Sequence, residues 1–216
     1  MRSRGRTRRG GRTPRPARFS APRPRARLSS WCDAIWVQMP DDHPVAVPAE
    51  RLQAPPPALQ GEFASGHLLI GGVDLGDVES TRRAMLAAAM RLGGMDVLVN
   101  VAGGFQWQTL ADGDVETWDQ LYRMNLRTAV VSCKQALPML LERGRGRIVN
   151  IGAGAAAARA GAGMGAYTAS KAGVQKLTES LADELKDRGI TVNAILPGTI
   201  DTPRNRSDMP DADFSR

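Results

Sequence analysis

The sequence predicts an α/β fold built on a parallel, doubly wound sheet. Short apolar runs alternate with segments of helical periodicity from about residue 61 onward. The runs are continuously apolar, which is typical of parallel strands covered by helices on both faces. Ligands bind at the carboxyl ends of the strands in such sheets, so functional residues are expected directly after each run. The four expected strands cover residues 67–73, 97–101, 147–151 and 190–196.

Three helices are expected between and beside these strands, over 77–92, 114–142 and 164–188. The second begins at Asp114, a residue type that favours helix N-caps. The third stops at Gly189, which suits a helix end. Apolar residues near one side of the first helix are Val78, Met85, Ala89 and Met90. Apolar residues at helical spacing in the third are Val174, Leu177, Leu181 and Leu185.

Residues 1–60 are expected to form an Arg/Pro-rich tail and linker, and residues 61–216 the folded domain. Residues 1–30 hold eleven arginines and no acidic residue. They account for the net charge of +7, because the remaining 18 basic residues face 22 acidic ones. With few large apolar side chains, this segment cannot offset its ordering entropy, so disorder is expected. Two apolar runs, 34–39 and 44–47, could make short strands, which Pro40, Pro44 and Pro48 interrupt.

The arginine-rich segment has competing interpretations. It could bind nucleic acid or another acidic surface, or it could be a targeting peptide. It could also be a solvated tail, or a stretch read from the wrong start or frame of a GC-rich gene. We favour these last two interpretations, so no nucleic-acid partner is expected.

Composition argues against several other classes of function. Two cysteines, Cys32 and Cys133, cannot build a disulfide framework. The two histidines, His43 and His67, lie far from other metal ligands, so no metal site is expected. No apolar run approaches the roughly 18 residues that a membrane span needs. We expect a cytoplasmic protein that acts on a small molecule.

Tyr167 and Lys171 are the strongest candidates for proton transfer. They are four residues apart in the helix expected over 164–188, so they share one face of it. A free phenol has a pKa of about 10, which is too high for efficient proton transfer near neutrality. A neighbouring ammonium favours the phenolate, so we expect it to lower the pKa of Tyr167. The pair alone is weak evidence, because helices contain this spacing by chance.

Further motifs accompany the pair in a fixed order. Asn100-Val-Ala-Gly-Gly104 ends the second expected strand, Asn125 lies within the second helix, and Pro197-Gly-Thr-Ile-Asp-Thr202 follows the last strand. Together with Tyr167 and Lys171, this set resembles the short-chain dehydrogenase/reductase family, whose motifs read NNAG, a helical Asn, YxxxK and PGxxxT. The resemblance implies a partial Rossmann-like domain. It also implies an NAD(P)H-dependent oxidoreductase that transfers hydride to a carbonyl or imine.

The resemblance assigns roles residue by residue. Tyr167 would transfer the proton, Lys171 would lower its pKa and bind the nicotinamide ribose, and Asn125 would hold a water in the proton relay. Other matched positions would line the cofactor, NAD or NADP, a choice that the sequence does not reveal. They are Asp74, which would contact the adenine, and Asn100, Ala102, Gly103, Pro197, Gly198, Ile200 and Thr202.

Gly154 stands where most family members have a catalytic serine. The sequence before Tyr167 and the segment 201–215 resemble dihydropteridine reductases, which also lack that serine. Those enzymes reduce quinonoid dihydropterins, and Phe105 or Trp107 could stack on such a ring. Core packing is the alternative for both aromatic residues, and other carbonyl or imine substrates remain open.

Two parts of the family pattern are not found in the sequence. The TGxxxGxG turn that cradles the cofactor pyrophosphate is absent, and the chain stops at Arg216, before the family's last helix and strand. A gap in the sheet is therefore expected between the strands 67–73 and 97–101. We expect weak cofactor binding, with an inactive truncated or frameshifted fragment, or a non-enzymatic interaction protein, as the alternative. Helices 114–142 and 164–188 match the family's dimer-forming pair, which implies a homo-oligomer.

Overall fold

A computed structural model describes residues 35–36, 68–70, 72–202 and 205–206. The chain divides into two units, Met1–Trp31 and Cys32–Arg216, and all described residues belong to the second. The arginine-rich segment and the apolar run 44–47 lie outside the described residues.

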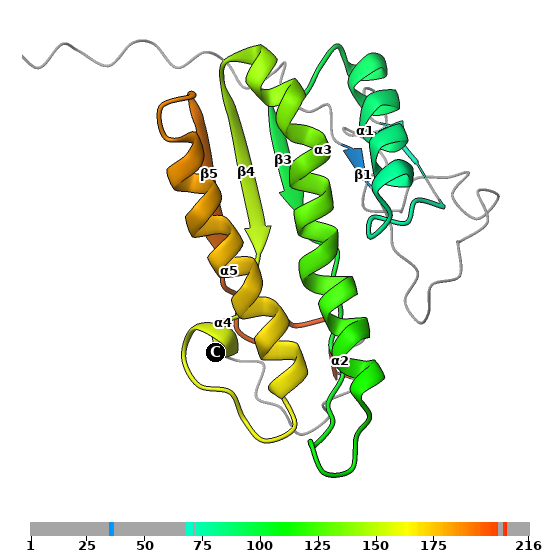
Figure 1. The fold of residues 1–216 in the computed structure, drawn as a ribbon, viewed down its shortest axis with the longest axis vertical. Helices are drawn as coiled ribbons and strands as arrows, with labels where there is room; N and C mark the ends of the chain where they lie inside the picture. The colour runs from blue at the N-terminus through cyan, green and yellow to red at the C-terminus, as the bar shows by residue number, and fades with distance from the viewer. Residues whose placement is uncertain (1–34, 37–67, 71, 203–204, 207–216) are drawn as a thin grey trace, which may run out of the picture. The chain divides into compact units, whose positions relative to one another are not determined.

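The fold is centred on a three-stranded parallel sheet in the order β3-β4-β5 (Figure 1). These strands are β3 (Val97–Asn100), β4 (Gly146–Ile151) and β5 (Ile190–Ile195). Their register places Asn100 opposite Asn150, and Asn150 opposite Ala194. All three strands therefore end at one edge of the sheet. The three expected strands agree with the observed ones to within one residue at each end.

A separate two-stranded parallel sheet joins β1 (Ile35–Trp36) to β2 (Leu68–Leu69). The run 34–39 contributes the two-residue strand Ile35–Trp36, in agreement with the expected short strand there. The strand expected over 67–73 is shorter, because only Leu68–Leu69 is paired. The described residues contain no pairing between β2 and β3.

The first helix, α1 (Val78–Leu92), begins at Asp77, whose side chain accepts a hydrogen bond from the Ser80 amide at 2.7 Å. It ends at Gly93, which has φ 76° and so occupies the left-handed region. The buried residues are Thr81, Ala84, Met85 and Ala88. The expected apolar side was therefore partly wrong, since Met90 is 85% exposed.

The helix expected over 114–142 is not one continuous α-helix. It divides into α2 (Val115–Leu121), a π-helical segment η3 (Tyr122–Arg127), and α3 (Thr128–Arg143). Asp114 caps α2 by accepting from the Thr117 amide, as the sequence predicts. The wider π-helical turn contains Asn125, whose side chain makes hydrogen bonds outside the helix that are described below. Such segments are often found at functional sites.

Two helices follow β4. The short α4 (Gly154–Ala157) was not anticipated, and α5 (Gly165–Leu185) corresponds to the helix expected over 164–188. In α5, Val174, Leu181 and Leu185 are buried as predicted. No helix among the described residues is long and apolar enough to cross a membrane.

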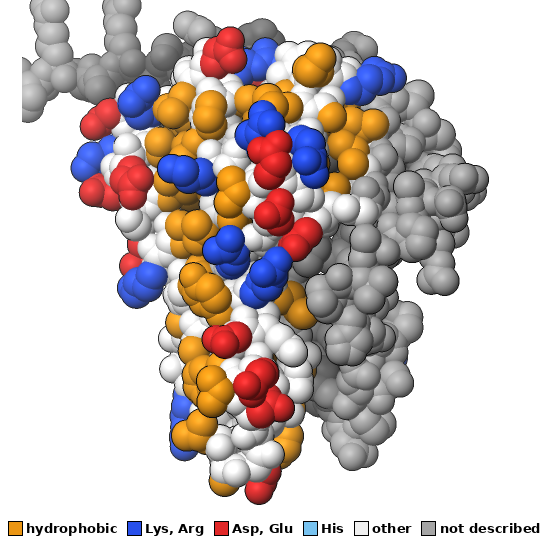
Figure 2. Space-filling view, turned by 45° about the vertical axis from the view of Figure 1, so that its right-hand side comes forward, with side chains coloured by type: hydrophobic (Ala, Val, Ile, Leu, Met, Phe, Trp, Pro, Cys, Tyr) orange, Lys and Arg blue, Asp and Glu red, His pale blue; other side chains and the backbone are white. Residues whose placement is uncertain are grey.

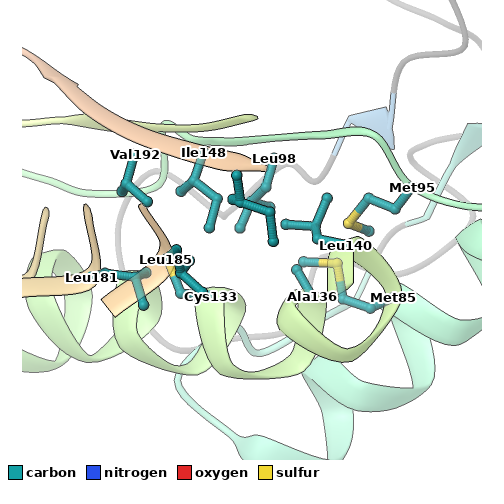
Figure 3. Packing of buried hydrophobic residues seen from close by; sticks show 11 residues of the cluster. Met85, Met95, Leu98, Cys133, Ala136, Leu140, Ile148, Leu181, Leu185 and Val192 are labelled. Carbon is teal, nitrogen blue, oxygen red and sulfur yellow. The ribbon is translucent and has the colours of Figure 1, made fainter. Parts of the chain in front are cut away.

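The main hydrophobic core lies between one face of the sheet and the helices α3 and α5. Figure 3 shows Leu98, Ile148 and Val192 of the strands pointing toward Leu140 and Leu181 of the helices. Fully burying a large aliphatic side chain contributes roughly 1.5–3 kcal/mol, so this layer holds α5 firmly against the strands. The rest of the cluster comprises Met85, Met95, Cys133, Ala136, Leu185 and Ile190.

Candidate active site

Several of the expected functional residues lie close to one another beside the carboxyl ends of β3, β4 and β5. A side-chain carbon placed on Gly103 would lie 2.5 Å from Asn125 Oδ1 and 3.1 Å from Lys171 Nζ. The turn after β3 is therefore in direct contact with η3 and α5. After β4, the Gly154 amide donates to the Pro197 carbonyl at 2.8 Å, which joins this turn to the loop after β5. Gly198, in that loop, faces open space.

Lys171 is buried on α5, with 6% of its surface exposed. Its ammonium donates to the carbonyl oxygen of Ile151, at the end of β4, over 2.9 Å. Burial lowers the pKa of this ammonium, because desolvation disfavours its charge. An ammonium has three protons, so two donors remain for other groups.

Tyr167 lies one turn before Lys171 and is partly buried. Burial raises the pKa of its phenol above the ordinary value of 10. The expectation that Lys171 lowers this pKa is therefore wrong for this structure, in which loss of hydration dominates. The phenol is neutral at pH 7 and can donate a proton.

Phe105 contacts Tyr167 edge to face, with ring centroids 5.0 Å apart and an angle of 85° between the planes. Phe105 is nevertheless 50% exposed, so the core-packing alternative does not describe it. Trp107 is 59% exposed, and its indole N–H donates to the Ala162 carbonyl at 2.9 Å. A side chain on Gly163, which has φ +75°, would collide with that indole. Trp107 therefore holds the loop before α5.

Asn125 is 1% exposed, and both N–H donors of its side-chain amide are used by protein partners. Its Oδ1 accepts from the Gly104 amide at 2.8 Å, and its Nδ2 donates to the Gly104 carbonyl at 3.0 Å. Nδ2 also donates to Ser170 Oγ at 2.9 Å. This side chain therefore fixes the turn after β3 to α5, a contact that the sequence did not reveal.

Asp74, expected near an adenine, is bonded within the protein. Its two carboxylate oxygens contact the Gly76 amide at 2.8 Å and Arg123 Nη2 at 2.7 Å. Arg123 lies in η3, two residues before Asn125. The ion pair thus links the start of α1 to the π-helical segment of the site. Its half-exposed position makes it a weak contributor to stability.

A second buried polar chain lies behind the turn at Asn100. Asn100 Nδ2 donates to Asn150 Oδ1, and Asn150 Nδ2 donates to Thr178 Oγ1, each over 2.8 Å. Asn100 also donates to the Cys133 thiol, whose pKa is raised by burial to about 11. Asn150 and Thr178 were missed in the sequence, because their pairing depends on the register of β3 against β4. No group of three potential metal ligands occurs within the described part of the chain.

Comparison with known proteins identifies the family. The model for "short chain dehydrogenase" matches residues 43–213, which is most of the chain. The chain belongs to the short-chain dehydrogenase family. The match covers every described element of the site, from β2 to the loop after β5. The resemblance inferred from the four motifs is thereby confirmed at the level of the family.

Relatives of this short-chain dehydrogenase differ in their described activities. It is 36% identical to "D-beta-hydroxybutyrate dehydrogenase" of Rhizobium meliloti, over 69% of this chain and 57% of the relative. It is 40% identical to "Nodulation protein G" of Azospirillum brasilense, over 60% of this chain and 52% of the relative. The chain thus spans little more than half the length of these curated relatives.

Solved structures of the family share the fold. A dehydrogenase/reductase from Sinorhizobium meliloti matches with a TM-score of 0.67 and 33% identity, over 79% of this chain and 64% of that one. A short-chain dehydrogenase from Burkholderia cenocepacia in complex with NADP matches with a TM-score of 0.59 and 38% identity, over 63% and 55%. The partial Rossmann-like α/β fold predicted from the sequence is confirmed.

The described residues fit the nicotinamide half of a dinucleotide better than the phosphate half. The buried Lys171 ammonium donates to Ile151 and keeps two donors for other groups, and Gly198, in the loop after β5, faces open space. By contrast, the N-cap residue of α1 is Asp77 and its first turn holds Glu79, and these carboxylates disfavour a phosphate at that helix end.

Proposed function

We propose that the protein is an NAD(P)H-dependent oxidoreductase that reduces a small carbonyl or imine compound. The observation that carries this proposal is the buried Lys171 ammonium, one helical turn from the partly buried Tyr167, beside the turn at Gly103. A bound nicotinamide would supply the hydride. NAD and NADP both remain candidates, because the described residues include no group assigned to the adenosine ribose.

Tyr167 is the proposed proton donor in the reduction. Its raised pKa keeps the phenol protonated at neutral pH, which suits donation to the oxygen or nitrogen that becomes negative as hydride arrives. Lys171 would then stabilise the phenolate that remains and would hold a ribose hydroxyl with its free donors. Asn125, whose side chain binds Gly104, would orient the turn that lines the nicotinamide. Cofactor-lining roles are proposed for Asp74, Asn100, Ala102, Gly103, Pro197, Gly198, Ile200 and Thr202.

We further propose a dihydropteridine reductase-like substrate, a quinonoid dihydropterin. Gly154 offers no hydroxyl to polarise a simple ketone, so a conjugated imine that needs only Tyr167 is favoured. The half-exposed ring of Phe105, in edge-to-face contact with Tyr167, and the exposed ring of Trp107, bonded to Ala162, offer flat apolar surfaces for stacking.

A second proposal is that the chain self-associates through the helices expected over 114–142 and 164–188, and the exposed apolar residues that support it lie on the first of them, in α2, η3 and α3. Val115, Tyr122 and Val130 are 69%, 51% and 40% exposed, and they follow one another about two helical turns apart. Exposed apolar residues in such a series suit a protein interface. Figure 2, which views the helical side, shows hydrophobic side chains in several groups between charged ones.

The function is tested by mixing the full chain with NADH or NADPH and a quinonoid dihydropterin, and following the loss of reduced nicotinamide. A simple ketone serves as the comparison substrate. Turnover with the dihydropterin that exceeds turnover with the ketone supports both the activity and the substrate class. Turnover with the ketone alone would overturn the pterin proposal, and no turnover with any carbonyl or imine would overturn the activity.

A further inference from the structure

Ser170 lies between the two proposed catalytic residues on α5, and it is 5% exposed. Its hydroxyl donates to the Tyr167 carbonyl over 2.7 Å and accepts from Asn125 Nδ2 over 2.9 Å. A serine hydroxyl has one proton to donate. That proton is used within α5, so the contact with Asn125 depends on the oxygen as an acceptor.

The partner of Ser170 is itself bound to the turn that follows β3. Asn125 contacts both the amide and the carbonyl of Gly104, at 2.8 and 3.0 Å. A continuous set of hydrogen bonds therefore runs from Gly104 through Asn125 and Ser170 to the backbone of Tyr167. Buried polar networks of this kind fix the relative position of their members, because any displacement leaves a donor or acceptor unpaired.

Thr168 provides the comparison within the same helix. It is 7% exposed, and its hydroxyl contacts the carbonyls of Met164 and Gly165 at 2.8 and 3.3 Å. Both partners lie within one turn of Thr168, at the start of α5. A buried hydroxyl in this part of α5 can thus be satisfied locally, whereas that of Ser170 also accepts from a different element.

We infer that Ser170 is a positioning residue that sets the distance between the turn at Gly103–Gly104 and the helical turn that carries Tyr167 and Lys171. This role rests on the proposed function, because those two segments would hold the nicotinamide and the proton donor. Ser170 acts through Asn125 and the Tyr167 backbone. In a Ser170→Ala variant, Nδ2 of Asn125 would keep only its hydrogen bond to the Gly104 carbonyl.

Amide hydrogen exchange tests the link without cofactor or turnover. In Ser170→Ala, the Gly104 amide should exchange at least about tenfold faster than in the parent chain, because its acceptor Asn125 is less restrained. In Thr168→Val, which also removes a buried hydroxyl from α5, the exchange rate of Gly104 should stay within about twofold of the parent. Equal rates in Ser170→Ala and Thr168→Val would overturn the inference.

Ser170→Thr and Ser170→Val form a second pair, which keeps the test decisive if the alanine variant does not fold. The threonine retains the acceptor oxygen and should keep slow exchange at Gly104, while the valine should not. Where the parent chain turns over substrate, kcat should fall about tenfold in Ser170→Val relative to Ser170→Thr, with KM changed less than about twofold. If the parent chain shows no turnover but the Gly104 amide exchanges faster in Ser170→Val, the proposed function fails while the positioning role of Ser170 stands. If the Gly104 amide exchanges at the parent rate in Ser170→Val and turnover is normal, the positioning role of Ser170 is rejected while the proposed function stands.

Discussion

The ammonium of Lys171 lies 2.9 Å from the carbonyl oxygen of Ile151, so the proposed catalytic lysine also attaches α5 to the end of β4. The same side chain approaches Gly103, in the turn after β3. One buried cation thus contacts two of the three strand ends. Burial raises the pKa of its neighbour Tyr167, so the phenol stays protonated over a wider pH range, which suits a proton donor in reduction.

The titration of Tyr167 is the first prediction. Only two tyrosines occur in the chain, so Tyr122→Phe leaves a single phenol to observe. The absorbance of the Tyr167 phenol should give a titration midpoint above the ordinary pKa of 10, because burial raises the pKa of this group. Reductive turnover should persist through neutral pH and decline only as the phenol ionises, since the protonated form is the donor. A midpoint below 10 would show that Lys171, and not desolvation, controls this group.

Gly154→Ser should extend the substrate range toward simple ketones. The new hydroxyl would supply the hydrogen bond that the glycine lacks, and kcat/KM for a ketone should rise about tenfold. The side chain would lie 3.2 Å from the Pro197 carbonyl, a close contact that should cost about 1 kcal/mol or less of stability. Gly154→Ala is the control, since it adds the carbon without the hydroxyl. Equal ketone turnover in both variants would show that the serine hydroxyl does not cause the gain.

Thr178→Val should destabilise the fold by breaking the buried chain of hydrogen bonds behind Asn100. It removes the acceptor of the buried Asn150 amide and leaves that donor unpaired, at a cost of about 1–3 kcal/mol. Thr191→Val on β5 is the matched control, because Thr191 is exposed and its change should be nearly neutral. The free energy of unfolding in urea measures both. Similar values for the two variants would mean that the Asn100–Asn150–Thr178 chain contributes little.

Tyr122→Glu should weaken self-association by at least about tenfold, because it places a charge on the exposed apolar series of α2, η3 and α3. Light scattering over a range of concentrations measures the effect. Glu116→Gln, in the first turn of α2, is a control for altered charge on the helix that precedes η3. A parent chain that remains monomeric at every concentration would contradict the proposed interface.

Much of the fold was readable because strands and helices of this family are marked by local patterns. The i, i+4 spacing of Tyr167 and Lys171 predicted their common helix, and the three apolar runs predicted β3, β4 and β5. The π-helical turn at Asn125 was not readable, because a six-residue segment has too few apolar positions to distinguish it from an α-helix. The contacts of Ser170 and Thr178 were missed since they join residues 45 and 28 positions apart. Met90 was misassigned because apolar character alone does not determine which side of α1 is covered.

The central claim is that the Tyr167 hydroxyl donates the proton in a nicotinamide-dependent reduction. The most direct measurement compares steady-state reduction by Tyr167→Phe and Tyr122→Phe under one set of conditions. The first variant keeps an aromatic ring for the contact with Phe105, so its fold should be retained, while kcat falls at least about 100-fold. The second should match the parent chain. Retained turnover in Tyr167→Phe, with its fold verified, would contradict the account.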